Sequence, residues 1–539
     1  MEMNNRNFTK HLKDDIPASL VVFLVALPLC LGIALASGAP LLSGLVTGIV
    51  GGLVVALLSG STLAVSGPAA GLTIIVLDGI EAIGSFEGFL CAVILAGALQ
   101  FLLGVVKAGV IGHYFPSSVI RGMLAAIGLI LILKQIPHFL GIDQDFFGDI
   151  AFFQSDGRNT FSEILYAFSN VRWGALIVGV VSLALIILWS RPFVQKTPLS
   201  IVPGALVAVF AGIGLNQLYL AVAPEMVIQT EHLVQLPIIG SFGDMQRELA
   251  FPDFSQFFNI NIFRTAITIA IIASIETLLS VEATDKLDPE KHRTPLNREL
   301  RAQGIGNMIA GLIGGIPMTA VIVRSTANIG AGGKTKMSAF YHGVLLLVCA
   351  LLIPGILNMI PLAALAAVLL HVGYKLTKPI LFKKQWKLGF DQFIPFIVTV
   401  VAILFTDLLV GISIGMAVGF YYILRANYNT PFSFVTQSKD THAHYEIHLS
   451  EHVSFLNKAS LAKALDQLPS GSVVEIYGDN TKFIDYDVIE AIYEFHDVAE
   501  ERGVQISLIN IPLEGIHGKI VNGQATFRPK PTPVPTAEQ

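Results

Sequence analysis

The chain has 539 residues, of which 53% are hydrophobic and only 14% charged, and its net charge at pH 7 is −5. Soluble proteins carry about 25% charged residues, so this composition excludes an ordinary soluble protein and predicts one that is mostly embedded in lipid. No basic stripe interleaved with aromatic residues occurs, so we expect no nucleic-acid partner. The three cysteines, Cys30, Cys91 and Cys349, lie in apolar segments and form neither a metal-ligand spacing nor a disulfide framework.

The first candidate span is Ile16–Ser37, which has 22 residues and no charge. It is long enough to cross a hydrocarbon core of about 30 Å, and because more spans follow at once we interpret it as a retained helix, not a signal peptide. Apolar segments recur to about residue 425 and predict fourteen transmembrane segments. They lie near 16–37, 41–59, 67–79, 87–107, 117–140, 173–190, 199–222, 261–281, 302–314, 317–329, 338–358, 361–374, 392–406 and 408–425.

Charges alternate between the predicted loops. Lysine and arginine gather between residues 286 and 301 and between 375 and 387, whereas the loops 143–156 and 224–248 are acid-rich. Basic loops mark the cytoplasmic side of a membrane protein. The pattern therefore predicts a multi-pass protein of the inner (plasma) membrane with both termini in the cytoplasm.

Four regions follow from these patterns. Residues 1–13 are predicted to be a cytoplasmic N-terminus and residues 14–426 a transmembrane domain. The segment 427–515 has three strand-like runs between amphipathic helical stretches and predicts a small cytoplasmic α/β domain. The runs are Tyr445–Leu449, Ser472–Tyr477 and Gln505–Asn510. The proline-rich tail, 516–539, is predicted to be disordered.

Two apolar segments are interrupted at matching places. Gly67 and Pro68 stand at the start of the third segment, and Gly315 and Pro317 at the start of the tenth. Such pairs are typical of transporters built from inverted repeats. Half-helices that begin at mid-membrane would point free N–H groups at an anion, with the prolines in their first turns. The alternative is that glycine and proline merely kink two ordinary helices.

Glu276 is isolated within an apolar segment. Eleven uncharged residues separate it from Arg264. A carboxylate in hydrocarbon costs about 2.5–3.5 kcal/mol and typically marks a pathway or a coupling site. We expect Glu276 to bind and release a proton during a transport cycle; the alternative is a structural glutamate neutralised by a fixed partner.

Several stretches resemble the SulP family of anion transporters. They are Val65–Gly71 (VSGPAAG), Ser274–Lys286 (SIETLLSVEATDK), Asn297–Asn307 (NRELRAQGIGN) and Gly314–Gly343 (GGIPMTAVIVRSTANIGAGGKTKMSAFYHG). The resemblance implies an α-helical polytopic protein with fourteen spans in a 7+7 inverted repeat. It also implies a core domain that moves against a gate domain, a C-terminal STAS domain and a homodimer.

The resemblance further implies which residues form the site. The substrate-binding residues would be Ala69, Ala70 and Gly71 on one side and Met318, Thr319 and Ala320 on the other, with Arg324 adding positive potential or, alternatively, anchoring the topology. Bicarbonate carriers of this family have a threonine where Thr319 stands and a second one where this chain has Ala69. Their sodium-coupled members have an aspartate and a threonine where this chain has Glu276 and Ser280. This difference favours proton coupling or uncoupled exchange and leaves a sodium site at these two residues open.

The predicted function is secondary active transport of a small inorganic oxyanion, with bicarbonate as the first choice. A sulfate–proton symporter or an anion exchanger is the alternative, and a channel-like anion conductor is a further one. No nucleophile–base constellation, nucleotide loop or zinc-ligand pattern is found, so we expect neither an enzyme nor a cofactor. The STAS-like segment has Asp485, Tyr486 and Asp487 where a phosphorylatable serine would be expected, so we expect a scaffold role for it.

Overall fold

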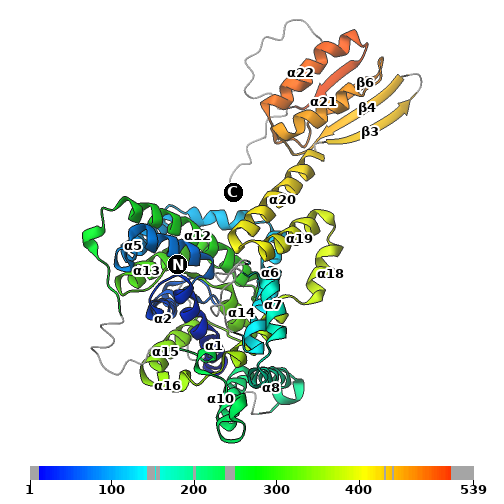
Figure 1. Ribbon diagram of the computed structural model, residues 1–539. Coiled ribbons are helices and arrows are strands. Elements are labelled where there is room, and N and C mark those ends of the chain that lie inside the picture. Colours follow the sequence, from blue (N-terminus) through cyan, green and yellow to red (C-terminus); the bar gives the residue numbers. More distant parts are fainter. Residues whose placement is uncertain are drawn as a thin grey trace, which may run out of the picture. The chain divides into compact units, whose positions relative to one another are not determined.

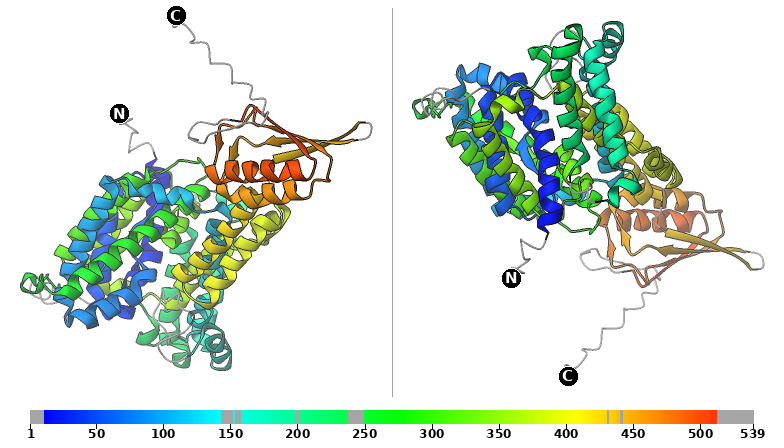
Figure 2. Two further views of the ribbon diagram at one scale, coloured as in Figure 1. Left: turned by 90° about the horizontal axis from the view of Figure 1, so that it is seen from above. Right: turned by 90° about the horizontal axis from the view of Figure 1, so that it is seen from below.

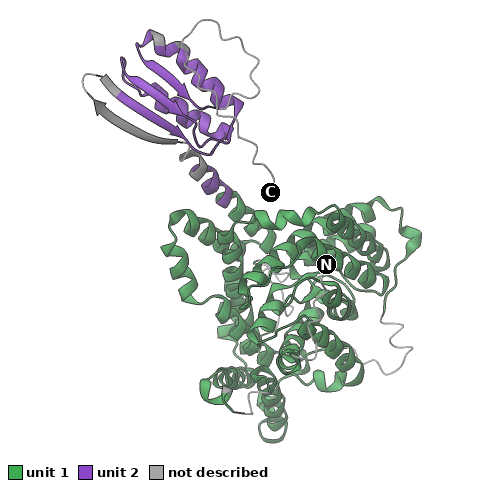
Figure 3. Ribbon diagram, turned by 180° about the vertical axis from the view of Figure 1, so that it is seen from behind, with its two compact units in different colours: residues 1–418 green, residues 419–539 purple. Residues whose placement is uncertain are grey.

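A computed structural model describes residues 11–142, 152, 158–197, 202–236, 249–429, 432–439 and 442–511. The chain divides into two compact units, residues 1–418 and 419–539 (Figure 3). The first unit is almost wholly helical, and the second is a small α/β unit (Figure 1).

The helices of the first unit follow the predicted apolar segments closely. In its first half they are α1 (Leu12–Ala36), α2 (Leu41–Val50), η1 (Gly51–Val55), α3 (Ala56–Leu58), η2 (Ala70–Leu72), α4 (Thr73–Ile83), α5 (Phe86–Val105), η3 (Ala108–Tyr114), α6 (Ser117–Leu140), α7 (Thr160–Ser169), α8 (Trp173–Trp189), α9 (Pro192–Gln195) and α10 (Gly204–Val222). In its second half they are α12 (Ile260–Leu287), α13 (Leu296–Leu312), α14 (Ile322–Gly330), α15 (Met337–Leu352), α16 (Pro354–Leu357), α17 (Leu362–Leu376), α18 (Pro379–Lys387), α19 (Phe390–Phe405) and α20 (Leu408–Asn429), the last running into the second unit.

Many of these helices are apolar around their whole circumference, as expected for a polytopic membrane protein. Within the described residues, eight are long and apolar enough to cross a bilayer, and the pair α7 and α8, bent by 111°, adds a ninth candidate. Figure 2 shows the helices of the first unit packed side by side in a bundle. The prediction of a multi-pass α-helical protein is confirmed.

Glycine allows the closest helix contacts in this bundle. α5 and α13 meet at Gly97 and Gly304, where a Cβ on Gly97 would lie 2.7 Å from the carbonyl oxygen of Gly304. α15 similarly approaches η1, since a Cβ on Gly52 would lie 2.4 Å from the Cα of Gly343. Small residues let helix backbones approach within a membrane, where burial of apolar surface supplies no driving force.

The two interrupted segments each begin as a short strand. β1 (Ser66–Pro68) precedes η2 and α4, and β2 (Met318–Ala320) precedes α14. This corrects the expectation that Pro68 and Pro317 lie in first helical turns, because Pro68 ends β1 and Pro317 stands directly before β2. The residue before a proline is disfavoured in the α region, so extended backbone continues through these positions and the helices begin later.

The second unit contains a four-stranded sheet in the order β3-β4-β6-β8. Its elements are β3 (Phe432–Lys439), β4 (His442–Leu449), β5 (His452–Val453), η8 (Phe455–Asn457), α21 (Lys458–Asp466), β6 (Val473–Tyr477), β7 (Phe483–Ile484), α22 (Tyr486–Glu501) and β8 (Gln505–Ile509). β3 pairs with β4 antiparallel, and β4, β6 and β8 pair in parallel. The three predicted strands are confirmed as β4, β6 and β8, whereas β3 was not predicted.

Candidate functional site

β1 and β2 are buried in the first unit and pair antiparallel, and we call this pair of strands the β1–β2 crossing. Ser66 lies opposite Ala320, Gly67 opposite Thr319 and Pro68 opposite Met318. The ladder continues outward, because the Val321 amide donates to the Val65 carbonyl at 2.8 Å. The starts of the two interrupted segments, about 250 residues apart in sequence, are thereby fixed against each other.

Side chains from other elements hold β1 in place. The Ser325 hydroxyl accepts from the Val65 amide at 3.0 Å, and the Asn328 side chain donates to the Leu63 carbonyl at 3.0 Å. Gln303 of α13 donates to the Ser66 hydroxyl at 2.6 Å. Residues of the second half of the chain therefore fix the first interrupted segment.

β2 is held even more directly. The Asn307 side chain accepts from the Met318 amide at 2.7 Å and donates to the Met318 carbonyl at 3.1 Å, while its amide nitrogen also donates to Gln100 at 2.8 Å. The Thr277 hydroxyl accepts from the Ala320 amide at 3.4 Å. All these groups are buried, so losing one of them would leave an unpaired backbone group in the interior.

The two half-helices begin without side-chain caps. Ala69 precedes η2 and Val321 precedes α14, both in extended conformation, and neither start has a side-chain cap hydrogen bond. The first N–H groups of a helix have no partner within that helix. Uncapped starts therefore present backbone donors and the positive ends of helix dipoles toward the β1–β2 crossing.

Glu276 of α12 lies against one of these starts. Its side chain is 7% exposed, and a Cβ placed on Gly71 would lie 3.2 Å from Glu276 Oε2. Glu276 Oε2 has no hydrogen-bond partner in the described part of the chain. The structure thus brings together two residues that the sequence analysis assigned to different roles, and a Cβ at position 71 would contact the carboxylate tightly.

Arg324 lies behind the crossing, on α14. Its side chain is fully buried, and a Cβ on Gly67 would lie 2.0 Å from Arg324 Nη1. None of its three guanidinium nitrogens has a hydrogen-bond partner among the residues that the structure describes. The Cys30 thiol lies beside it, but a thiol is a weak acceptor. A buried cation without a counter-ion makes the site electropositive.

The remaining predicted residues are distributed as follows. Ala70 belongs to η2, and Thr319 is the fully buried middle residue of β2, with its hydroxyl 3.2 Å from the Ala320 carbonyl oxygen. Ser280 lies one turn beyond Glu276 on α12 and is also buried. Residues four apart share one face of a helix, so the oxygens of Glu276 and Ser280 lie on the same side of α12.

A cavity of about 40 Å³ lies between α1, η2, α6 and the start of α14. Ala70 and Arg324 line it from the crossing, and Lys134 and Gln135 line it from α6. A single water needs roughly 10–15 Å³, so the cavity has room for a very small ligand. The sequence analysis missed Lys134, although a lysine in an apolar segment carries the same kind of signal as Glu276.

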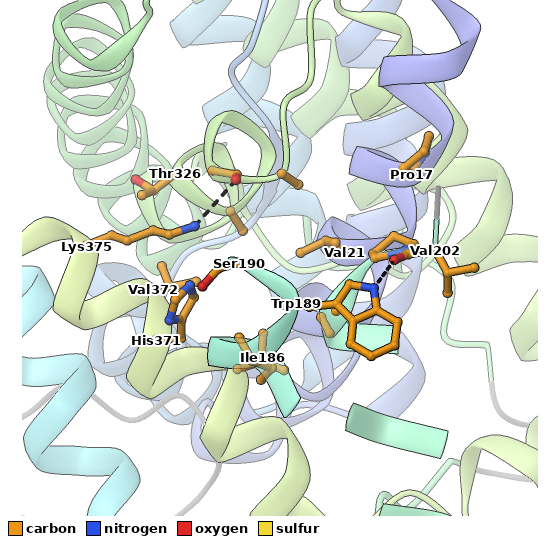
Figure 4. Close-up of a pocket in the computed structure, with 17 residues that line it drawn as sticks. Pro17, Val21, Ile186, Trp189, Ser190, Val202, Thr326, His371, Val372 and Lys375 are labelled. Atoms are coloured by element: carbon orange, nitrogen blue, oxygen red, sulfur yellow. Dashed lines mark hydrogen bonds between the residues drawn. The ribbon is translucent and has the colours of Figure 1, made fainter. Parts of the chain in front are cut away.

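A second cavity, of about 220 Å³, lies between α1, α8, α10, α14 and α17 (Figure 4). Lys375 of α17 reaches the last residue of α14, donating to the Gly330 carbonyl at 3.5 Å, and Trp189 donates to the Val202 carbonyl at 2.9 Å. His371 and Thr326 also line it. Both ends of the half-helix α14 therefore border a cavity.

Comparison with known proteins shows which family has this sequence pattern. A model of the sulfate permease family matches residues 12–401. The chain belongs to the sulfate permease family. The relative named "Putative sulfate transporter YvdB", from Bacillus subtilis, is 31% identical over 424 residues, covering 78% of this chain and 74% of YvdB. The bicarbonate transporter BicA of Picosynechococcus is 28% identical over 428 residues, covering 78% of this chain and 71% of BicA.

Solved structures of this sulfate permease fold are similar as well. The structure of murine Slc26a9 in its inward-facing state has a TM-score of 0.64 at 17% identity, and the match covers 93% of this chain and 85% of that one. The transmembrane domain of a cyanobacterial BicA has a TM-score of 0.51 at 24% identity and covers 75% of this chain and 97% of that one. At these identities the similarity concerns the fold.

Proposed function

We propose that this sulfate permease family member is a secondary active transporter of a small inorganic oxyanion, with bicarbonate as the first candidate substrate and sulfate as the second. The proposed substrate-binding residues are Ala69, Ala70, Gly71, Met318, Thr319, Ala320 and Arg324. Glu276, with Ser280, is the proposed coupling site for a proton or a sodium ion. Relatives named as sulfate and as bicarbonate transporters support an anion of this class.

The observation that carries this proposal is the guanidinium of Arg324, which is buried at the β1–β2 crossing and, within the described ranges, has the weakly accepting Cys30 thiol beside it and no acidic partner. A lone buried cation is costly, and such residues in membrane proteins usually serve function. An anion between the uncapped starts of η2 and α14 would offset this charge. Backbone donors can hold an oxyanion of any of these kinds, so they supply affinity for the class and not for one member.

Glu276 supports coupling to a cation. Its carboxylate adjoins Gly71, the middle residue of η2, and so lies beside the proposed anion position. An ionised carboxylate there repels a bound anion, whereas a protonated or sodium-bound one does not. Binding of the cation and of the anion would therefore favour each other, and this reciprocity is the thermodynamic requirement for cotransport.

α6 forms the wall of the smaller cavity that faces the crossing. Lys134 and Gln135 line the smaller cavity opposite Ala70, and they come from a helix that belongs to neither interrupted segment. A displacement of α6 away from the crossing would open this cavity and remove the Lys134 charge at the same time. We propose that such a displacement exposes the site during alternating access, within a homodimer whose termini face the cytoplasm.

Uptake into proteoliposomes tests the proposal. Labelled bicarbonate and labelled sulfate would be offered separately, with pH and sodium gradients imposed one at a time and with empty liposomes as control. We expect bicarbonate accumulation driven by one of the two gradients. Sulfate accumulation alone would overturn the choice of bicarbonate, and conductance without accumulation would overturn coupled transport in favour of a channel.

A further inference from the structure

The second unit carries a cluster of imidazole and carboxylate groups unrelated to the transport site. His444, Glu446 and His448 alternate along β4, so their side chains leave the same face of the sheet. Ile447 and Leu449 alternate with them and are buried in the core of this unit. The polar face of β4 is therefore distinct from the face that packs into the hydrophobic core.

The neighbouring strand extends this polar face. β6 pairs in parallel with β4, and Glu475 lies opposite Glu446 while Tyr477 lies opposite His448. His444 Nε2 is 3.4 Å from Glu475 Oε2, and His448 Nε2 is 3.5 Å from Glu446 Oε2. One ligand atom each from His444, Glu446 and Glu475 lies within 4.8 Å of the other two.

The His444 Nε2–Glu475 Oε2 distance of 3.4 Å is close to the ligand separation in a coordination shell. Ligand atoms about 2.0–2.1 Å from a tetrahedral zinc ion are separated from one another by roughly 3.3–3.4 Å. We propose that His444, Glu446 and Glu475 form a binding site for a divalent transition metal of the Zn²⁺ class, with His448 or water completing the shell. Two carboxylates and neutral imidazoles supply the charge and the nitrogen and oxygen donors that this class prefers.

Tyr477 orients the proposed ligand Glu475. Its hydroxyl donates to Glu475 Oε2 at 2.6 Å, and this hydrogen bond raises the pKa of Tyr477 to about 12. The phenol therefore stays protonated near neutral pH and holds the carboxylate in place. The ring of His448 stacks on Tyr477 with 4.6 Å between ring centroids. Hydrogen bonds of this kind from outside the shell commonly fix metal ligands.

Exposure fits a site that exchanges its metal with solvent. The side chains of His444 and Glu475 are each 28% exposed and that of Glu446 is 19% exposed. Cross-strand pairs of opposite charge contribute only about 0.2–1 kcal/mol, so ion pairing alone gives little reason to gather these groups on two strands. A metal ion would cross-link β4 and β6 and stabilise this unit against unfolding.

The test is Zn²⁺ titration of the purified full-length protein, free of any affinity tag, by calorimetry. Co²⁺ absorption would report the geometry. We expect one Zn²⁺ per chain, with affinity reduced at least about tenfold in both His444→Ala and Glu475→Gln. Binding should also weaken at acid pH, because protons compete with the metal ion for its ligands. His292→Ala is the matched control, because it removes an imidazole that contacts two carboxylates, Asp288 and Glu290, in the first unit.

Glu475→Gln preserves the shape of the side chain and keeps an acceptor for the Tyr477 hydroxyl. Loss of Zn²⁺ binding in this variant would therefore not be explained by misfolding. Thermal unfolding with and without Zn²⁺ gives a second measurement, and we expect a rise in Tm for the wild type and for His292→Ala only. Absence of Zn²⁺ binding by the wild type at about 100 µM would overturn the proposal. Equal binding by the wild type and both cluster variants would overturn it too.

Discussion

The two interrupted segments occupy equivalent places in the molecule but differ in chemistry. The first, from Ser66 to Leu72, contributes small or apolar residues and uncapped backbone. The second, from Met318 to Gly330, contributes a hydroxyl at Thr319 and a buried guanidinium at Arg324. Glu276 completes the asymmetry, because it approaches the first segment from a helix of the second half.

This difference shows how two repeats with the same backbone architecture can have different side-chain chemistry. Both segments present helix starts, which come from backbone geometry alone and do not depend on side-chain identity. Arg324 and Glu276, the charged residues that lie against the first segment, come from the second half, and Gly67 and Gly71 leave the space that their side chains occupy. We therefore expect substitutions in the second half to change transport and those in the first to act mainly through steric exclusion.

The largest effect is expected for Arg324→Met. Removing the guanidinium that we assign to the anion should lower uptake by about two orders of magnitude. Because an unpaired buried arginine costs about 2.5–3.5 kcal/mol in a bilayer, the variant should be at least as stable as the wild type. Uptake and thermal unfolding would be measured together, with Arg301→Met as an exposed control. Normal uptake by Arg324→Met would remove Arg324 from the site.

Glu276→Gln should abolish accumulation driven by a cation gradient while leaving anion exchange intact. Glutamine keeps the shape beside Gly71 but can neither bind a proton nor supply the charge for sodium. The measurement is uptake against a concentration gradient, compared with exchange at equilibrium. Glu282→Gln, on the same helix and paired with Lys286 at 4.0 Å, is the matched control. If Glu276→Gln still accumulated the anion, and its uptake responded to the pH and sodium gradients as that of the wild type does, the coupling role would be contradicted.

Asn307→Ala should weaken substrate binding through backbone disorder. The substitution removes both bonds to Met318 and leaves its buried N–H group unpaired, at a cost of about 1–3 kcal/mol. We expect KM to rise by about tenfold and Tm to fall. Asn297→Ala loses one bond, to the Gly109 amide, away from the crossing and should leave KM unchanged. An unchanged KM in Asn307→Ala would mean that the position of β2 does not limit binding.

The smallest effect is expected for Thr319→Val, which keeps shape and removes one hydroxyl. If Thr319 donates to the anion, its loss costs about 1–1.5 kcal/mol, or about a five- to tenfold rise in KM. Stability should change little, because the one hydrogen bond that the hydroxyl makes to a described residue is to the neighbouring Ala320 carbonyl, at 3.2 Å. Thr326→Val, on the wall of the larger cavity, provides the control. Identical KM values for the two variants would exclude a direct contact from Thr319.

Much of this protein could be predicted because its signals are local. Long apolar runs mark membrane helices, Gly–Pro interruptions mark broken ones, and alternating apolar residues mark the strands β4, β6 and β8. Glu276 was recognised because a single carboxylate stands out in an apolar run, and Lys134 could have been recognised by the same criterion. These features depend on composition and spacing over a few residues.

The tertiary structure decided what depends on residues distant in the chain. Pairing of β1 with β2 placed Pro68 in a strand instead of a helix, because the hydrogen bonds that define a strand come from a segment about 250 residues away. The unpaired state of Arg324 and the contact of Glu276 with Gly71 likewise depend on which helices meet at the crossing. Local sequence determines which residues are costly to bury. Only the packing of the helices determines which groups lie beside them and offset the cost of burial.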